Sequence, residues 1–186
     1  MANVDSPFGF VPIKHLDGSE YNGQVNRYFI NASQPEMFKN QLVDLGGTAD
    51  SNGVPNIVPI SAGTGNPILG SIVAFEADRE DQGKTSNPAS TAAYALVADA
   101  PDVVYEAQTT TFAAANTGTN AAVSSPGTGS STTGNSNSQI DGATYKTTTD
   151  QIRTLRLKRI EQNEFGAFAV VECFINEHRF KGVAGV

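Results

Sequence analysis

The sequence predicts an all-β protein, a small β-barrel or β-sandwich, and three observations lead to this fold class. The chain has 186 residues, 39% of them hydrophobic, which is enough for one self-sufficient core. Short runs rich in Val, Ile, Tyr and Phe alternate with turn-forming dipeptides such as Asn22-Gly23 and Asn52-Gly53. No stretch keeps the apolar period of a helix, because Asn and Gly repeatedly interrupt the one Ala-rich candidate, Phe112 to Val123.

Each predicted strand is a run of alternating or continuous apolar residues bounded by turn signals. In the C-terminal third, Leu155 and Leu157 are expected on one face of a strand, and Val171, Cys173 and Ile175 on one face of the next, with a hairpin at 162–166 between the two. The predicted strands cover 24–30, 41–45, 56–60, 68–75, 94–98, 103–108, 153–160 and 168–176.

The first twenty residues predict an extended N-terminal arm (1–20) in front of a single β domain (21–186). Pro and Gly recur in this segment and prevent regular structure, although many of its other residues are apolar. Such a segment packs on its own domain or reaches out to another chain, and the sequence leaves both alternatives open. The candidate contact residues of the arm are Phe8, Phe10, Val11, Pro12 and Ile13.

Residues Thr109–Thr149 are predicted to form a long polar loop or insertion. Ser, Thr, Gly and Asn dominate the segment, and its only charged residues are Asp141 and Lys146. Two outcomes are open: a mobile loop, or an irregular β-segment that pairs with a neighbouring strand or subunit. The scarcity of charge favours the second.

Charge and cysteine content exclude several classes of protein. The chain carries 12 basic and 19 acidic residues, a net charge of −7, which argues against binding to a nucleic-acid backbone. Its single cysteine, Cys173, excludes an intrachain disulfide. Neither a signal-peptide pattern nor a membrane-spanning apolar run is present, so we expect no membrane association and synthesis in the cytoplasm.

No motif predicts an enzyme, a cofactor or a metal. Gly83-Lys84-Thr85 resembles the end of a phosphate-binding loop, but Asp78 stands where that loop requires glycine. The acidic residues between Glu76 and Asp81 lack the spacing of a calcium loop and are better explained as a solvated turn. Cys173 is expected to be an inert core thiol, and His178 a surface or interface residue rather than a general base.

Several segments of the chain resemble the capsid cement, or head decoration, proteins of tailed bacteriophages. The opening Ser6–Ser19 (SPFGFVPIKHLDGS) is similar to the start of that family. So are Gly65–Val73 (GNPILGSIV) and the run from Tyr94 to Glu106, which includes YALVAD. The polar Thr/Gly/Ser stretch, the Leu/Arg strand after it and the closing Ile175–His178 (INEH) follow in the same order.

This resemblance implies a structural virion protein that binds the outer surface of a mature phage capsid and stabilises it against internal DNA pressure. Its partner would be the major capsid protein, its oligomeric state a homotrimer, and its location the outer capsid surface after synthesis in the bacterial cytoplasm. We further expect the arm to clamp the coat, so that deleting residues 1–13 abolishes head binding and leaves the body folded. The alternative is a head-fibre or tail-associated module that binds a receptor or glycan.

Overall fold

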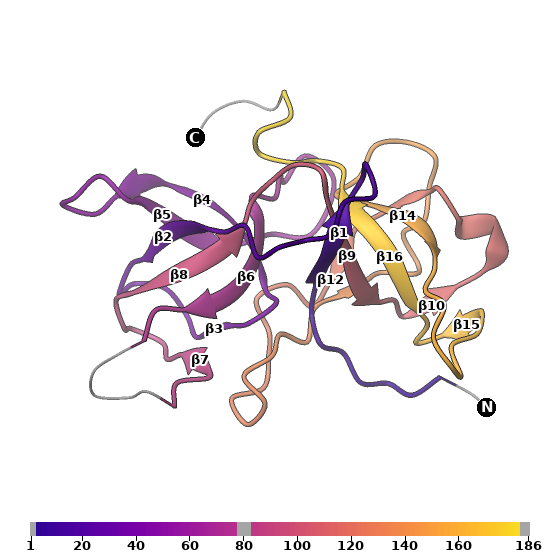
Figure 1. Cartoon of the computed structure of the whole chain (residues 1–186), viewed down its shortest axis with the longest axis horizontal. Coiled ribbons are helices and arrows are strands. Elements are labelled where there is room, and N and C mark those ends of the chain that lie inside the picture. Colours follow the sequence, from indigo (N-terminus) through magenta and orange to yellow (C-terminus); the bar gives the residue numbers. More distant parts are fainter. Residues whose placement is uncertain (1–2, 78–82, 183–186) are drawn as a thin grey trace.

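The chain folds into two β lobes, as a computed structural model describes for residues 3–77 and 83–182 (Figure 1). A closed barrel forms one lobe, and a five-stranded antiparallel sheet forms the other. The predicted all-β class is confirmed, since the described residues contain one short 3-10 helix, η1 (Ala114–Asn116), and no α-helix. These residues contain no helix that is long and apolar enough to cross a membrane.

The barrel is built from the chain between residues 26 and 98. Its strand order is β2-β5-β4-β6-β8; antiparallel pairing of β2 with β8 closes it, whereas β2 and β5 run parallel. Apolar side chains such as Ile30, Ile57 and Val97 fill the interior and are fully buried. The barrel strands are β2 (Asn26–Ile30), β4 (Leu42–Ala49), β5 (Pro55–Pro59), β6 (Gly70–Phe75) and β8 (Ala93–Ala98).

The five-stranded sheet covers the larger hydrophobic core with one of its faces. The predicted row of Val171, Cys173 and Ile175 lies in this core, together with Tyr105. Barrel-side residues such as Leu42 join the same cluster, so the two lobes share apolar contacts. In sheet order, the strands are β1 (Val11–His15), β9 (Val103–Gln108), β16 (Val170–Ile175), β14 (Ile152–Leu157) and β11 (Asn120–Ala121).

The polar segment 109–149 is paired within the chain's own fold, which decides between its two predicted outcomes. The hairpin at 125–138 within this segment also reaches the barrel. There the Lys39 amide donates to the Gly134 carbonyl, and the Ser136 amide donates to the Lys39 carbonyl, both at 2.9 Å. The short ladders are β3 (Met37–Phe38) with β7 (Ser86–Asn87), β10 (Thr111–Phe112) with β15 (Gly166–Ala167), and β12 (Val123–Ser124) with β13 (Gln139–Ile140).

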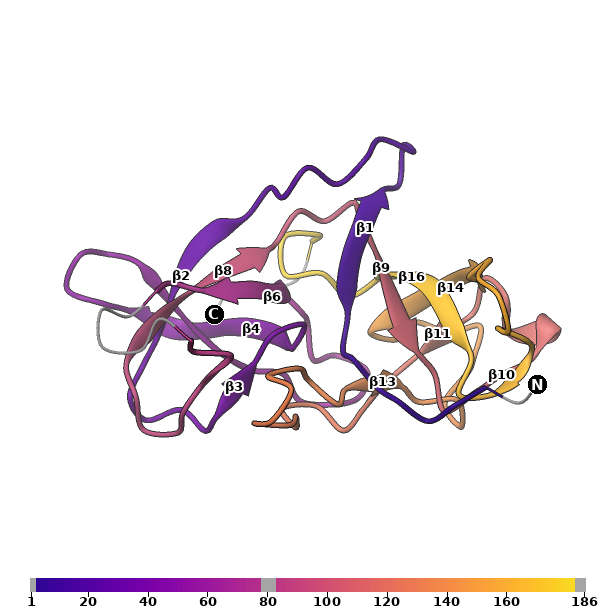
Figure 2. The same ribbon diagram turned by 60° about the horizontal axis from the view of Figure 1, so that its bottom comes forward.

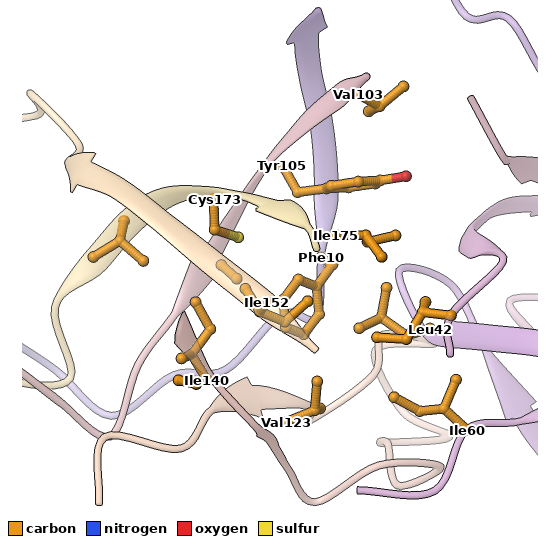
Figure 3. Packing of buried hydrophobic residues seen from close by; sticks show 14 of the residues in the cluster. Phe10, Leu42, Ile60, Val103, Tyr105, Val123, Ile140, Ile152, Cys173 and Ile175 are labelled. Atoms are coloured by element: carbon orange, nitrogen blue, oxygen red, sulfur yellow. The ribbon is translucent and has the colours of Figure 1, made fainter. Parts of the chain in front are cut away.

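The prediction of an N-terminal arm is wrong for residues 9–15. Residues 11–15 form β1 and pair with β9, while the Phe10 side chain is fully buried in the cluster that holds Ile152 and Ile175 (Figure 3). The Phe10 amide donates to the Asn40 carbonyl at 2.8 Å. Gly9 permits this approach, because a Cβ there would lie 2.3 Å from the Asn40 oxygen and its φ is +79°.

Residues 3–8 also lie along the sheet lobe, below β9 and β16 in Figure 2. The Asn3 amide group donates to the carbonyls of Glu164 and Ala167 at 2.8 and 2.9 Å. Gln108 donates to the Val4 carbonyl and accepts from the Ser6 amide. The predicted boundary at residue 20 is therefore not a structural one, because the N-terminal segment and residues 103–176 build the same lobe, and the barrel is inserted between them.

A buried glutamine joins the two lobes. Gln151 is fully buried, and its side-chain amide donates to the carbonyls of Ser61 and Asn66 at 2.8 and 2.9 Å. Its side-chain oxygen accepts from the Gly63 amide at 2.9 Å. Since an unpaired buried amide is costly, these bonds hold the 61–66 segment against β14.

His178 lies at this boundary and is fully buried, so its predicted surface position is wrong. Its Nδ1 accepts from the Phe180 amide at 3.1 Å, and residue 178 also forms a bridge with Ile68. Burial, and then the charge of Lys181, lowers the pKa of His178 to about 4. The imidazole is therefore neutral at physiological pH and serves packing rather than proton transfer.

Substitution of Phe10 tests the burial of the N-terminal segment. Phe10→Ala is expected to lower the free energy of unfolding by about 3–5 kcal/mol, because it leaves a cavity between the lobes. Urea denaturation followed by circular dichroism measures the change. Phe8→Ala is the matched control at a half-buried position and should cost clearly less. If both variants lose equally little unfolding free energy, the burial of Phe10 is contradicted. Deletion of residues 1–13 removes Phe10 and the first three of the five residues of β1, so the expectation that it leaves the body folded no longer holds.

The burial of His178 predicts a loss of stability in mild acid. Its folded-state pKa lies below the unfolded value, so protonation favours unfolding, and stability falls as pH drops from about 6.5 toward 4. Relative to His178→Gln, the wild-type chain should lose at most about 2 kcal/mol between pH 7 and pH 5. Urea midpoints at several pH values measure the difference. Parallel curves for the two proteins would show that His178 titrates normally.

Candidate functional site: the outer face of the five-stranded sheet

The face of the five-stranded sheet that points away from the core carries two cross-strand rows of side chains. Directly opposed residues of antiparallel strands lie on the same side of a sheet, so pairing across β1, β9, β16 and β14 defines each row. The rows are Lys14, Val104, Phe174 and Arg153, and Val11, Glu106, Glu172 and Arg156. We call this surface the outer face.

Two β-bulges shape the rows. The register shifts between Pro12 and Lys14 in β1, and between Thr154 and Arg156 in β14. The second bulge overturns the prediction that Leu155 and Leu157 share a face, because Leu157 packs against the core while Leu155 lines a hollow beside Arg156. An extra residue in one strand re-aims the side chains around it, and simple alternation cannot anticipate that.

The two carboxylates of the outer face are directly opposed, and each is compensated by cations. Glu106 and Glu172 are Cα partners on β9 and β16. Glu172 Oε2 lies 2.5 Å from Lys14 Nζ and 2.9 Å from Arg156 Nη2. Glu106 forms an ion pair with Lys158. Opposed like charges destabilise a sheet, so these cations are what allows both carboxylates to remain there.

The ion pairs decide the protonation state of Glu172. Its partial burial raises the pKa, but hydrogen bonds from Lys14 and Arg156 outweigh that effect and lower the pKa below its ordinary value. Glu172 is therefore ionised at neutral pH. A carboxyl group in this state cannot act as the general acid of a paired-carboxylate enzyme, which requires a raised pKa.

A hollow of about 510 Å³ opens at the edge of the outer face. His15 at its rim points Nδ1 toward Asp102 Oδ2 at 3.2 Å, the pairing that orients a catalytic histidine. The residues that line the hollow in the described chain include no Ser, Thr or Cys, so no hydroxyl or thiol nucleophile accompanies this pair there. The lining residues are Lys14, His15, Leu16, Gly18, Val104, Leu155, Arg156 and Glu172.

The thiol and the acidic turn that the sequence analysis considered lie outside the outer face. Cys173 is fully buried, and burial raises the pKa of its thiol far above the range of a reactive cysteine. Across residues 3–77 and 83–182, no group of His, Cys, Asp and Glu could hold a metal ion. Glu76 of the predicted acidic turn pairs with Arg27, while Asp78, Glu80 and Asp81 lie outside the described residues.

The structure separates the five predicted contact residues. Phe10 is in the core and cannot reach a partner in this fold, and Phe8 is half-buried. Val11 lies on the outer face, and Pro12 and Ile13 are half-buried on β1, the edge strand of the sheet. Pro12 lacks an amide donor, which makes this edge a poor template for a further strand.

The residues of the outer face that the sequence did not single out are Lys14, Glu106, Arg153, Glu172 and Phe174. Glu106 and Glu172 are single charges inside otherwise apolar strands, and this was the available signal. Comparisons of the chain with protein-family models, with curated proteins and with solved structures found no match.

Glu172 is expected to stabilise the sheet through its two cations. Glu172→Gln should lower the free energy of unfolding at pH 7 by about 1–2 kcal/mol, because Lys14 and Arg156 lose their common partner. The contribution is present above the unfolded pKa of about 4.3 and is lost as pH falls through the lower folded-state pKa. Denaturation curves from about pH 7 to pH 2 measure both effects. A difference that persists unchanged in acid would contradict the ion-pair explanation.

Proposed function

We propose that this chain is a structural virion protein that binds the outer surface of a mature phage capsid and stabilises its lattice. The proposal combines the resemblance of Ser6–Ser19 and the later segments to capsid cement proteins with the architecture of the body. Its partner would be the major capsid protein, with the chain attached as a homotrimer on the outside of the shell.

The observation that carries the proposal is that buried contacts and hydrogen bonds join the two lobes to each other. Phe10 contributes its side chain to the sheet core and accepts a hydrogen bond from Ser71 in the barrel at 2.7 Å. Gln151 and the 125–138 hairpin add further polar contacts across the boundary. Polar loops that are tied down in this way lose little conformational entropy on binding, so the body can attach to a lattice without a large ordering cost.

Stabilisation of a capsid by such a protein would follow from mass action. A protein that binds the mature lattice and not its disassembled state stabilises the lattice by a term that grows with free concentration over Kd. Attachment to several coat subunits at once increases the effect, because each later contact is made at a high effective concentration. No chemical reaction is required.

The head-fibre or tail-associated receptor-binding alternative depends on an accessible aromatic or polar platform. Tyr28 and Tyr105 are buried, and their hydroxyl groups bond to Asp99 and to the Ala98 carbonyl. These two side chains are therefore unavailable to a glycan. We retain this alternative as an outcome of the copy-number test.

Copy number in purified particles of the phage that encodes this chain tests the proposal. Quantitative mass spectrometry against the major capsid protein should find the two proteins in comparable amounts, because a cement protein covers the whole lattice. A handful of copies per particle would instead assign the chain to a vertex, fibre or tail.

Heads that lack the protein provide the functional half of the same test. Such heads are expected to release DNA at a lower temperature than wild-type heads. Addition of the purified chain should restore the release temperature in a concentration-dependent manner. The Lys39→Glu chain, changed at a half-buried position of the barrel lobe, serves as a control that changes no residue of the outer face.

A further inference from the structure

The outer face is basic, although the chain as a whole is acidic. The net charge of the chain is −7, yet the five cations on and beside the outer face outnumber the carboxylates of Glu106, Glu172 and Asp102. Pairing within the face uses Lys14 and Arg156 on Glu172, and Lys158 on Glu106. The cations are Lys14, Arg153, Arg156, Lys158 and Lys181.

Two of these cations flank one aromatic ring and have no carboxylate partner among the described residues. The Arg153 guanidinium lies 6.0 Å from the centroid of the Phe174 ring, and Lys181 Nζ lies 5.3 Å from the same centroid. Arg153 donates a hydrogen bond to the neutral side chain of Asn120 at 2.9 Å. Within residues 3–77 and 83–182, neither cation has an ion pair. Two like charges over a half-buried ring leave a positive potential that a partner's carboxylate would neutralise.

A recess lined by both apolar and charged side chains adjoins this charge cluster. Val104 stands between Lys14 and Phe174 in the same cross-strand row and lines the hollow of about 510 Å³ with Leu16 and Leu155. Leu16 is 44% exposed. Such a recess offers an apolar side chain of a partner a place beside charged groups.

We propose that the outer face binds an acidic segment of a partner protein. Asp or Glu side chains of that segment would pair with Arg153 and Lys181, and an apolar side chain would enter the recess formed by Leu16, Val104 and Leu155. The identity of the partner as a coat subunit rests on the function proposed above. The preference of this surface for an acidic segment is independent of that proposed function.

Charge complementarity favours an acidic protein over a nucleic acid. A DNA or RNA backbone extends well beyond a small basic patch and would meet the carboxylates of Glu106, Glu172 and Asp102, as well as the acidic barrel. A short acidic segment confines its negative charge to the patch. Its apolar residue also gains from the recess, for which a phosphate backbone has no counterpart.

A peptide titration of the full chain tests this surface without any assumption about the phage. The probe is a seven-residue peptide with one leucine between two runs of three glutamates, and the matched control peptide carries glutamines instead. Amide shifts of the ¹⁵N-labelled protein at low salt should cluster in β14, β16 and residues 178–182 for the first peptide only. A DNA duplex that binds the same face as tightly as the peptide would overturn the proposal, as would shifts centred on the barrel.

Matched charge reversals provide the quantitative arm. Lys181→Glu and Arg153→Glu should each weaken peptide binding about ten-fold, and added salt should weaken it in the wild type. Lys39→Glu, which makes the same charge change on the barrel lobe, should keep the wild-type affinity. Lys181 is exposed and its ammonium group makes no hydrogen bond to the described residues, so its reversal should not affect folding.

Binding of the same variants to heads that lack the protein separates the two proposals. If the wild-type chain saturates heads and the Lys181→Glu chain does not, the proposed function and the assignment of the outer face are both supported. If all variants bind heads equally and the peptide shifts lie elsewhere, the assignment of the outer face is wrong while the proposed function stands. If no variant binds heads but the peptide maps to the outer face, the proposed function fails and the surface serves another acidic partner.

Discussion

The burial of Phe10 is the contact on which the arrangement of the two lobes depends. Its side chain completes the core beneath the five-stranded sheet, while its amide and carbonyl groups bond to Asn40 and Ser71 of the barrel side. The N-terminal segment therefore belongs to both lobes at once. Strand β1 follows directly, so the position of Phe10 also sets the edge of the sheet that carries Lys14.

The outer face shows how an antiparallel sheet accommodates opposed carboxylates. Glu106 and Glu172 would repel each other across β9 and β16, and the cations that offset this repulsion come from β1, from β14 and from the turn that follows it. The charges are thus arranged by pairing between strands that are distant in sequence. The remaining cations, Arg153 and Lys181, lie at one end of the face.

A binding protein and an enzyme place different demands on such a surface. Glu172 of the outer face is held ionised at neutral pH by Lys14 and Arg156, whereas the neutral His178 is buried between the lobes and does not belong to this face. A docking surface requires fixed charge and a recess that stays open. The buried polar contacts of Gln151 and Gln108 hold the strands and loops around the face in place.

The sequence by itself determined the all-β class, the main strands and the core row of Val171, Cys173 and Ile175, because alternation along a strand is a local property of the chain. It also showed that the 109–149 segment lacks the charge of a solvated loop. Only the tertiary structure decided that Phe10 packs on its own chain and that His178 is buried. The bulge at Leu155 depends on the pairing of β14 with β16, and the outer face also depends on contacts as distant in sequence as that of Lys14 with Glu172, 158 positions apart. Such contacts form when distant strands meet, and no local pattern in the sequence records them.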